Sequence, residues 1–265
     1  MDYVFILNIT AFDLISAFNF DDYKRIPGLR PESGSVASQK AYRITRRTEA
    51  RYLSQVFPDG FPRQFSFIAT YKMASKTRNE HWDLLDVQDN RGNTQFSVRF
   101  DGKQRQIQVV YLNNFGEISV AKFDKKEVRD KEWHKIFIGI EEKYVTLVID
   151  CENTYKVALP NMATIETNGQ MVLGQSQKER TVMFDLQWLV ISCDPSKASR
   201  ADCKEIKPVV RLSRVVAEKV VYPQNHSHKT WNMGCKSICN FENNKGFLRS
   251  NTVLDIILSS TEKVC

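Results

Sequence analysis

Residues 131–151, KEWHKIFIGIEEKYVTLVIDC, constrain the fold more than any other part of the chain. Branched apolar side chains take every second position of residues 136–140 and again of residues 145–149, and the polar residues 141–143 stand between the two runs. Alternation of this kind is typical of antiparallel strands that bury one face. The stretch therefore predicts a β-hairpin. Cys151 continues its buried face, where a disulfide bond would tie the hairpin to a second sheet.

Further β-prone segments follow one another along the chain, separated by turn sequences such as FPDGFP at 57–62 and DNRGN at 89–93. Proline and glycine in such turns supply the backbone angles that strands cannot adopt. The other expected strands are residues 40–51, 65–73, 82–87, 95–100, 107–111, 118–123, 171–173 and 183–193. Many short strands with frequent turns predict a β-sandwich. The charged residues 125–132 are expected to form one helical turn.

The character of the sequence changes near Lys207. The 265 residues leave room for one large all-β domain, and no linker precedes about residue 205. Residues 207–265 carry nine basic residues against four acidic ones, with no internal repeat and no compact pattern. We therefore expect one domain over residues 11–206 and a poorly ordered C-terminal tail over residues 207–265.

The net charge of +7 is concentrated in that tail, so the remaining residues are close to neutral. A polyanion would have to bind a local cluster, and the global charge gives no argument for nucleic acid. No apolar run reaches the length of a membrane span.

Six cysteines are present, at positions 151, 193, 203, 235, 239 and 265. Two of them end apolar strands, as oxidised structural pairs do, which favours a secreted protein. The count by itself does not determine the pairing. The first ten residues are acidic rather than basic at their start, so they do not predict a signal peptide. Asn8 and Asn225 begin glycosylation sequons, which matter only in the secretory pathway.

Five stretches, taken together and in order, resemble one protein family. They are FDLISAF (12–18), VFPDGFPRQFSF (56–67), EWHKIFIGIEEKYVTLVIDC (132–151), residues 168–174 and FDLQWLVISCDP (184–195). The chain resembles the thrombospondin N-terminal-like domain, a relative of the laminin G domain. It is similar above all to the amino-terminal non-collagenous domain of fibril-associated collagens, with type IX alpha-1 nearest. The resemblance covers roughly residues 11–206 and depends on ordered spacing rather than on a single motif.

The resemblance implies an all-β laminin-G/concanavalin-like jelly-roll sandwich of two antiparallel sheets. It implies a secreted, non-enzymatic module of the extracellular matrix that has no cofactor and engages proteoglycans and other matrix proteins. It also implies a disulfide bond between Cys151 and Cys193. In the family a cysteine near the amino end pairs with one that matches Cys203, but here no cysteine precedes Cys151. The eleven glycines do not recur at every third position, so trimerisation through a collagen helix is not encoded.

Two basic clusters are candidates for binding heparin or heparan sulfate. In an extended strand, Arg43 and Arg47 would project to one side and Arg46 to the other. Clustered basic side chains bind sulfated glycosaminoglycans by releasing counterions and by direct contacts to sulfate. The alternative is a solvated face with local salt bridges. The first cluster is Lys40, Arg43, Arg46, Arg47 and Arg51, and the second is Lys197, Arg200, Lys204 and Lys207.

We predict no metal site, although two alternatives remain open. His81 and His134 each stand beside a tryptophan, and either could bind a metal with a carboxylate such as Asp83. Their more common role would be to surround a core tryptophan. The second alternative is zinc ligation in the tail, whose spacing matches no standard finger. Its residues would be His226, His228, Cys235 and Cys239.

The sequence contains none of the motifs that would indicate an enzyme. Glycosidases on jelly-roll sandwiches need two carboxylates across a cleft, and no E-x-D-x-E strand occurs. Gly-x-Ser-x-Gly, phosphate-loop and HExxH motifs are missing as well. The sequence therefore predicts a non-enzymatic matrix module that binds sulfated glycosaminoglycans and matrix proteins. The alternative is a secreted laminin-G-like lectin or a receptor-binding signalling module.

Overall fold

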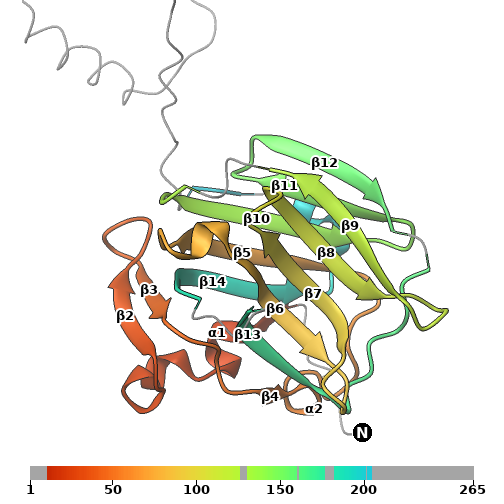
Figure 1. Cartoon of the computed structure of the whole chain (residues 1–265), viewed down its shortest axis with the longest axis horizontal. Helices are drawn as coiled ribbons and strands as arrows, with labels where there is room; N and C mark the ends of the chain where they lie inside the picture. Colours follow the sequence, from red (N-terminus) through yellow and green to blue (C-terminus); the bar gives the residue numbers. More distant parts are fainter. Residues whose placement is uncertain (1–10, 126–129, 160, 177–181, 201, 205–265) are drawn as a thin grey trace, which may run out of the picture. The chain divides into compact units, whose positions relative to one another are not determined.

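The computed structural model describes residues 11–125, 130–159, 161–176, 182–200 and 202–204. These residues form two antiparallel sheets packed face to face, which confirms the predicted all-β jelly-roll sandwich (Figure 1). The expected tail at 207–265 and both glycosylation sequons lie outside the described residues, as do the four candidate zinc ligands of the tail and residues 126–129 of the expected helical turn. The domain boundary at residue 206 therefore stays a prediction.

The larger sheet has eight strands in the order β12-β11-β10-β5-β14-β3-β2, and β1 pairs with β14 beyond the end of β3. Its central strand is β5, as the dense β-branched and aromatic content of FSFIATYKM predicts. The strands are β1 (Ala11–Asp13), β2 (Leu29–Ser33), β3 (Lys40–Ile44), β5 (Phe65–Met73), β10 (Trp133–Ile140), β11 (Tyr144–Ile149), β12 (Asn153–Ala158) and β14 (Phe184–Ser192).

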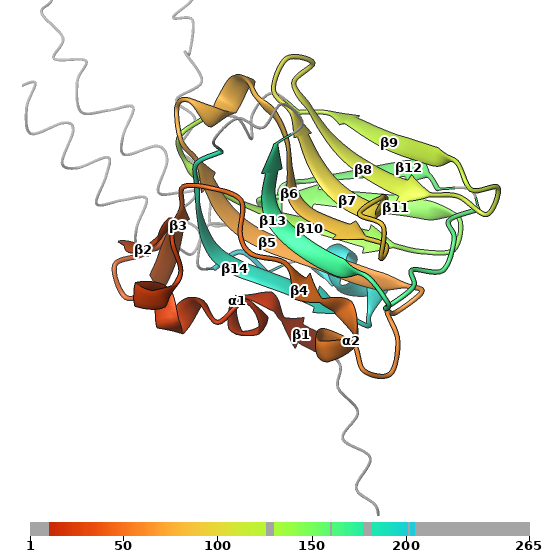
Figure 2. The same cartoon turned by 60° about the horizontal axis from the view of Figure 1, so that its bottom comes forward.

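The smaller sheet has six strands in the order β4-β13-β6-β7-β8-β9. They are β4 (Arg51–Tyr52), β6 (His81–Gln88), β7 (Thr94–Asp101), β8 (Gln106–Leu112), β9 (Ile118–Asp124) and β13 (Gln170–Ser176). Helical segments are short, and all of those described except η4, which follows β14, lie between strands. Figure 2 shows α1, β1 and α2 along one edge of the sandwich. They are α1 (Leu14–Ala17), η1 (Phe20–Arg25), α2 (Leu53–Val56), η2 (Thr77–Asn79) and η4 (Pro195–Arg200).

The hairpin predicted from residues 131–151 is present as β10 and β11. Ile136 pairs with Ile149 and Ile138 with Leu147, and the side chains of these four residues lie in the core between the sheets. The backbone N–H of Glu141 donates to the carbonyl oxygen of Tyr144 and closes the turn. The period-two pattern therefore predicted the hairpin and its buried face correctly, and the structure adds the register.

Cys151, in contrast, does not continue the buried face. The strand ends at Ile149, and Asp150 and Cys151 both adopt positive φ angles, 50° and 59°. This left-handed conformation turns the chain and interrupts the alternation, so the side chain of Cys151 is exposed. The expectation that a cysteine here ties the hairpin to the second sheet is wrong.

Aromatic side chains join the two sheets. Phe65 of the larger sheet meets Phe96 of the smaller sheet edge to face, with ring centroids 5.3 Å apart. Trp82 is fully buried and lies 5.1 Å from Phe100 and 4.8 Å from Phe184, which comes from the opposite sheet. Such pairs add to the free energy gained by burying the rings themselves.

The predicted strand over residues 40–51 is divided in two. β3 ends at Ile44 in the larger sheet, and the chain then crosses to the smaller sheet, where β4 pairs with β13. Thr48 lies on this crossing: its backbone N–H donates to the carbonyl oxygen of Leu173 (3.0 Å), and its hydroxyl accepts from the Leu173 N–H (2.9 Å). Because Arg46 and Arg47 lie beyond the strand, the expected alternation of their side chains does not apply.

The face of the smaller sheet turned away from the core carries a buried ion pair. The guanidinium of Arg99 donates to both carboxylate oxygens of Asp83, at 2.6 and 3.2 Å, and the hydroxyl of Ser97 also donates to Asp83. The side chain of Asp83 is only 1% exposed. Burial, together with the charge of Asp83, raises the pKa of nearby Asp86 to about 6. The charge of Asp83 is therefore tolerated here because Arg99 neutralises it.

Candidate functional site

The outer face of the larger sheet, which points away from the core, is partly covered by the η4 helix. Ile68, Phe137, Val148 and Val190 come from four adjacent strands and form a small apolar cluster with Ala198 of η4. The hydroxyl of Ser66 donates to the carbonyl oxygens of residues 194 and 195, at 2.8 and 3.0 Å, and so attaches the start of the helix to β5. The helix therefore has a defined position on the sheet.

Gly139 makes this close contact possible. A Cβ atom at this position would lie 2.6 Å from the carbonyl oxygen of Pro195 and 3.2 Å from the Cβ of Ala198. The first distance is shorter than a Cβ contact allows, and the neighbour is backbone. A side chain at position 139 would therefore push η4 away from the sheet.

A disulfide bond joins Cys151 to Cys203, with the Cα atoms 6.0 Å apart. The expected bond between Cys151 and Cys193 is wrong, and Cys193 is exposed at the end of β14. β10 and β5 separate β11 from β14. Three strand spacings amount to roughly 14 Å, whereas a disulfide needs Cα atoms within about 7 Å. Cys203 reaches Cys151 because η4 carries the chain back across the sheet.

His134 holds the strand ends beside this disulfide. Its Nδ1 lies 2.7 Å from Asp150 and its Nε2 lies 2.9 Å from Asp130. A second oxygen of Asp150 accepts the backbone N–H of Lys135. Burial acts to lower the pKa of His134, but the hydrogen bonds and charges of the two carboxylates outweigh it and raise that pKa above its ordinary value.

The raised pKa of His134 predicts a pH dependence of stability. The imidazolium stabilises the fold fully below the pKa of an unfolded histidine, and this contribution is lost as the pH rises through the higher folded-state pKa. We expect the free energy of unfolding to fall from pH 6 towards alkaline pH, and His134→Gln to flatten this profile. Urea denaturation across pH 6–9 measures it. An equal flattening by the control His81→Gln would contradict the assignment.

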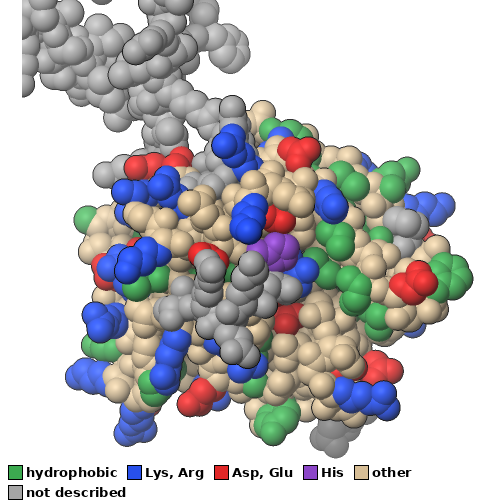
Figure 3. Space-filling view, viewed as in Figure 1, with side chains coloured by type: hydrophobic (Ala, Val, Ile, Leu, Met, Phe, Trp, Pro, Cys, Tyr) green, Lys and Arg blue, Asp and Glu red, His purple; other side chains and the backbone are tan. Residues whose placement is uncertain are grey.

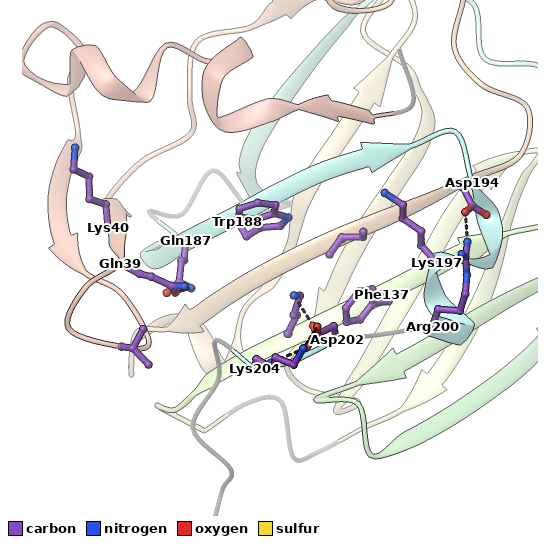
Figure 4. Close-up of a pocket in the computed structure, with 13 residues that line it drawn as sticks. Gln39, Lys40, Phe137, Gln187, Trp188, Asp194, Lys197, Arg200, Asp202 and Lys204 are labelled. Carbon is purple, nitrogen blue, oxygen red and sulfur yellow. Dashed lines mark hydrogen bonds and ion pairs between the residues drawn. The ribbon is translucent and has the colours of Figure 1, made fainter. Parts of the chain in front are cut away.

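Beside η4, the outer face of the larger sheet contains a groove of about 910 Å³, called here the basic groove. Five basic and two acidic side chains line it, together with Trp188 and Phe137. Figure 4 shows Lys197 and Arg200 on the η4 side, Lys40 on β3 and Trp188 between them. The lining residues are Val36, Gln39, Lys40, Ile68, Lys135, Phe137, Gln187, Trp188, Asp194, Lys197, Arg200, Asp202 and Lys204.

The charges of the basic groove are only partly compensated. Arg200 pairs with Asp194, and Lys204 lies 3.2 Å from Asp202. Hydrogen bonds from Ser196 and then the charge of Arg200 lower the pKa of Asp194, so this carboxylate stays ionised. Lys40 and Lys197 form no salt bridge with any described residue. The groove therefore keeps an excess of positive charge.

Lys135 connects the groove to the disulfide. Its ammonium donates to the carbonyl oxygen of Asp202 at 2.8 Å and lies 5.0 Å from the ring centroid of Phe137. Cys203 follows directly and is bonded to Cys151. Residues 202–204 are thus held against the sheet by the hydrogen bond at Asp202 and by the disulfide at Cys203, which keeps Lys204 at the edge of the groove.

The structure brings together the second predicted basic cluster and one member of the first. Lys197, Arg200 and Lys204 line the groove with Lys40, whereas Lys207 lies outside the described residues. On the face shown in Figure 3, in contrast, Lys and Arg side chains are interspersed with Asp and Glu.

The remaining members of the first cluster are dispersed. Arg43 pairs with Asp185 at 2.7 Å and with Glu32 at 2.8 Å, and the hydrogen bond to Asp185 raises the pKa of its guanidinium. Arg46 donates to the carbonyl oxygen of residue 27, and Arg51 to that of residue 18. Arg47 is exposed. The five residues of the first predicted cluster, Lys40 included, therefore do not form a single basic surface.

The two histidines considered for metal binding face different partners. His81 lies 3.3 Å from Asp101, whereas Asp83 is engaged by Arg99. At His134 the two carboxylates lie on opposite ring nitrogens, so the three groups do not converge on one point. In the described ranges no group of three or more His, Cys, Asp or Glu side chains is arranged to hold a metal ion.

Among the groove residues that sequence reasoning did not single out are Lys135 and Trp188. Lys135 lies in the predicted hairpin, and its alternation with Ile136 and Ile138 could have placed it on the outer face. Trp188 lies in a predicted strand, but a register shift between Leu186 and Trp188 sets its direction. No local pattern reveals that irregularity.

The chain is similar in sequence to laminin G domains and to collagens. The laminin G domain family model matches residues 76–187. The human collagen alpha-1(XVI) chain is 26% identical over 203 residues, which cover 76% of this chain and 12% of the collagen. The human collagen alpha-1(XXI) chain is 32% identical over 172 residues, covering 63% of this chain and 18% of the collagen. The chain thus spans less than a fifth of the length of these relatives.

A solved structure agrees on the fold. The binding domain of Paraclostridial Mosquitocidal Protein 1 superimposes with a TM-score of 0.53 at 14% identity, covering 66% of this chain and 45% of that one. Of the described residues, no helix is long and apolar enough to cross a membrane. Nearness to collagen type IX in particular stays a prediction. The chain contains a laminin G-like domain whose homologues are the fibril-associated collagens, among them collagens XVI and XXI.

Proposed function

We propose that this laminin G-like domain is a non-enzymatic module of the extracellular matrix that binds heparin or heparan sulfate chains in the basic groove. The observation that carries the proposal is the convergence of basic side chains from β3, β10, η4 and residues 202–204 on one groove. β3, β10 and residues 195–204 are far apart in the sequence and meet only through the fold. Lys40 and Lys197 supply positive charge that no described carboxylate neutralises through a salt bridge.

The energetics of such a site follow from its charge. A polyanion that contacts several Lys and Arg side chains releases condensed counterions, so affinity falls steeply as salt rises. At 0.15 M salt, charges more than about 8 Å apart are largely screened, so clustering matters more than net charge. This agrees with a domain that is near neutral as a whole and basic in one groove.

The matrix assignment rests on the homologous collagens, and it brings with it secretion and contacts to other matrix proteins. The disulfide between Cys151 and Cys203 supports the same compartment, because structural disulfides persist in oxidising surroundings. The homologues are structural collagen domains, which supports a role without catalysis.

Removing charge from the groove should weaken heparin binding. We expect a triple variant, with Lys40, Lys197 and Lys204 each changed to Ala, to elute from heparin at clearly lower salt. The slope of log K against log salt should fall by about two to three units, because up to three counterion-releasing contacts are lost. Heparin chromatography and titrations at several salt concentrations measure both effects.

A matched control removes the same charge elsewhere: Arg91, Lys103 and Lys122, all exposed on the smaller sheet or its turns, are changed to Ala. Equal weakening by this control would show that only net charge matters. A double variant of Arg46 and Arg47 tests the first predicted cluster. Loss of binding there, with the groove variant unchanged, would move the site away from the groove.

The lectin alternative keeps one supporting observation, the exposed indole of Trp188 in the groove. A lectin of neutral glycans should bind them without salt dependence. Binding to a neutral glycan array that disappears on calcium removal would favour this alternative over a polyanion site.

A further inference from the structure

The side chain of Trp188 is 51% exposed although it lies on β14, inside the larger sheet, whereas the exposed Tyr144 of the same sheet lies at the start of β11. The neighbouring Leu186 and Leu189 of β14 are fully buried in the core. Leu186 pairs with Tyr71 and Trp188 with Thr70, so Gln187 is an extra residue in the strand. Such a bulge redirects the side chains that follow it. The indole is thereby placed on the outer face, inside the basic groove.

Two polar residues of neighbouring strands lie in the same cross-strand row as Trp188. Thr70 lies between Trp188 and Lys135, with which it pairs on its other side. The Thr70 hydroxyl is buried and has no hydrogen-bond partner in the described part of the chain. Beside the ring, the side-chain amide of Gln187 donates to that of Gln39. The groove thus combines the exposed indole of Trp188 with the side-chain amides of Gln39 and Gln187 and with basic side chains at its rim (Figure 4).

This combination fits a sugar ring better than a purely ionic ligand. A pyranose ring has an apolar C–H face that packs on an aromatic ring and a rim of hydroxyl groups that amides can bind. Sulfate or carboxylate groups on the neighbouring sugars would reach Lys40 and Lys197 at the rim. A phosphate chain has no apolar face and could use only the cations.

We propose that one pyranose ring of an anionic polysaccharide stacks on Trp188, which makes this residue the determinant that separates polysaccharides from other polyanions. The inference rests on the proposed function, since it names the ligand class of the same groove. Single-stranded nucleic acid would also stack its bases on an aromatic ring. The near-neutral charge of the domain and the presence of one exposed indole among the residues that line the groove favour the polysaccharide.

The test compares three probes: a heparin oligosaccharide, inorganic polyphosphate and single-stranded oligothymidylate. Dissociation constants are measured at one salt concentration for the native chain, Trp188→Ala and Trp188→Phe. Phe115→Ala is the matched control, because Phe115 is 76% exposed in the turn between β8 and β9, away from the groove residues. We expect Trp188→Ala to bind heparin about tenfold more weakly, in the range of aromatic stacking contacts. Its polyphosphate affinity should be unchanged, and Trp188→Phe should keep most of the heparin affinity.

Other outcomes separate the two proposals. If Trp188→Ala binds heparin as tightly as the native chain while the triple lysine variant is weakened, the stacking inference fails and the proposed function stands. Equal losses for heparin and polyphosphate, or an equal dependence of oligothymidylate binding on Trp188, also overturn the inference. If the native chain itself does not bind heparin, both fail.

Discussion

Changing Cys203 to Ser is expected to lower the free energy of unfolding by roughly 4 kcal/mol, the value that loop-closure entropy assigns to a bond spanning this distance in sequence. Cys151 and Cys203 are separated by 52 residues, and the bond closes the segment that contains β12, β13, β14 and η4. Without it, the unfolded chain regains the freedom of that whole loop. Guanidinium denaturation of the oxidised proteins measures the difference.

Cys193→Ser is the matched control for this prediction. It removes an exposed thiol at the end of β14 and should leave the free energy of unfolding nearly unchanged. Non-reducing peptide mapping should recover a peptide pair that contains Cys151 and Cys203. A Cys193 variant as unstable as the Cys203 variant, or a mapped pair of Cys151 with Cys193, would refute the pairing.

Loss of the Cys151–Cys203 disulfide should also weaken ligand binding in the basic groove. Residues 202–204 are held by the disulfide and by the bond from Lys135 to the Asp202 carbonyl oxygen. Once the disulfide is removed, only the hydrogen bond keeps Lys204 at the edge of the groove. Heparin binding by Cys203→Ser should therefore weaken, although less than in the triple lysine variant.

Changing Arg99 to Met is expected to cost about 3–5 kcal/mol of stability at neutral pH, as is usual when one partner of a buried ion pair is removed. The side chain of Asp83 is 1% exposed, and Arg99 contacts both of its oxygens. Asp86 stands close by, and its pKa is already raised to about 6. The variant would leave two buried carboxylates without the guanidinium.

A double-mutant cycle isolates this effect. The Asp83→Asn change removes the unpaired charge, so the double variant should recover most of the stability lost by Arg99→Met alone. The penalty should also shrink at lower pH as the carboxylates become protonated. Arg91→Met, in an exposed turn, is the control for loss of a basic residue. A single variant as stable as this control would show that the pair contributes little.

Local pattern was sufficient for the strands that carry the core. The alternation in residues 136–149 predicted the hairpin and its buried face, because side chains two residues apart in a strand share a face. The same pattern could have placed Lys135 on the outer face. It could not place Trp188, because the extra residue Gln187 breaks the period.

The sequence by itself determined that this chain builds a sandwich of short antiparallel strands, and its ordered stretches identified the relatives. Only the tertiary structure decided which charges and thiols meet. Arg43 is neutralised by Asp185, 142 residues away, and Cys151 meets Cys203 rather than Cys193 because two strands intervene. The alternation of apolar and polar side chains depends on residues that are neighbours in the sequence, whereas the order of strands in a sheet depends on packing across the whole domain. The basic groove depends on this strand order, because its residues come from different strands.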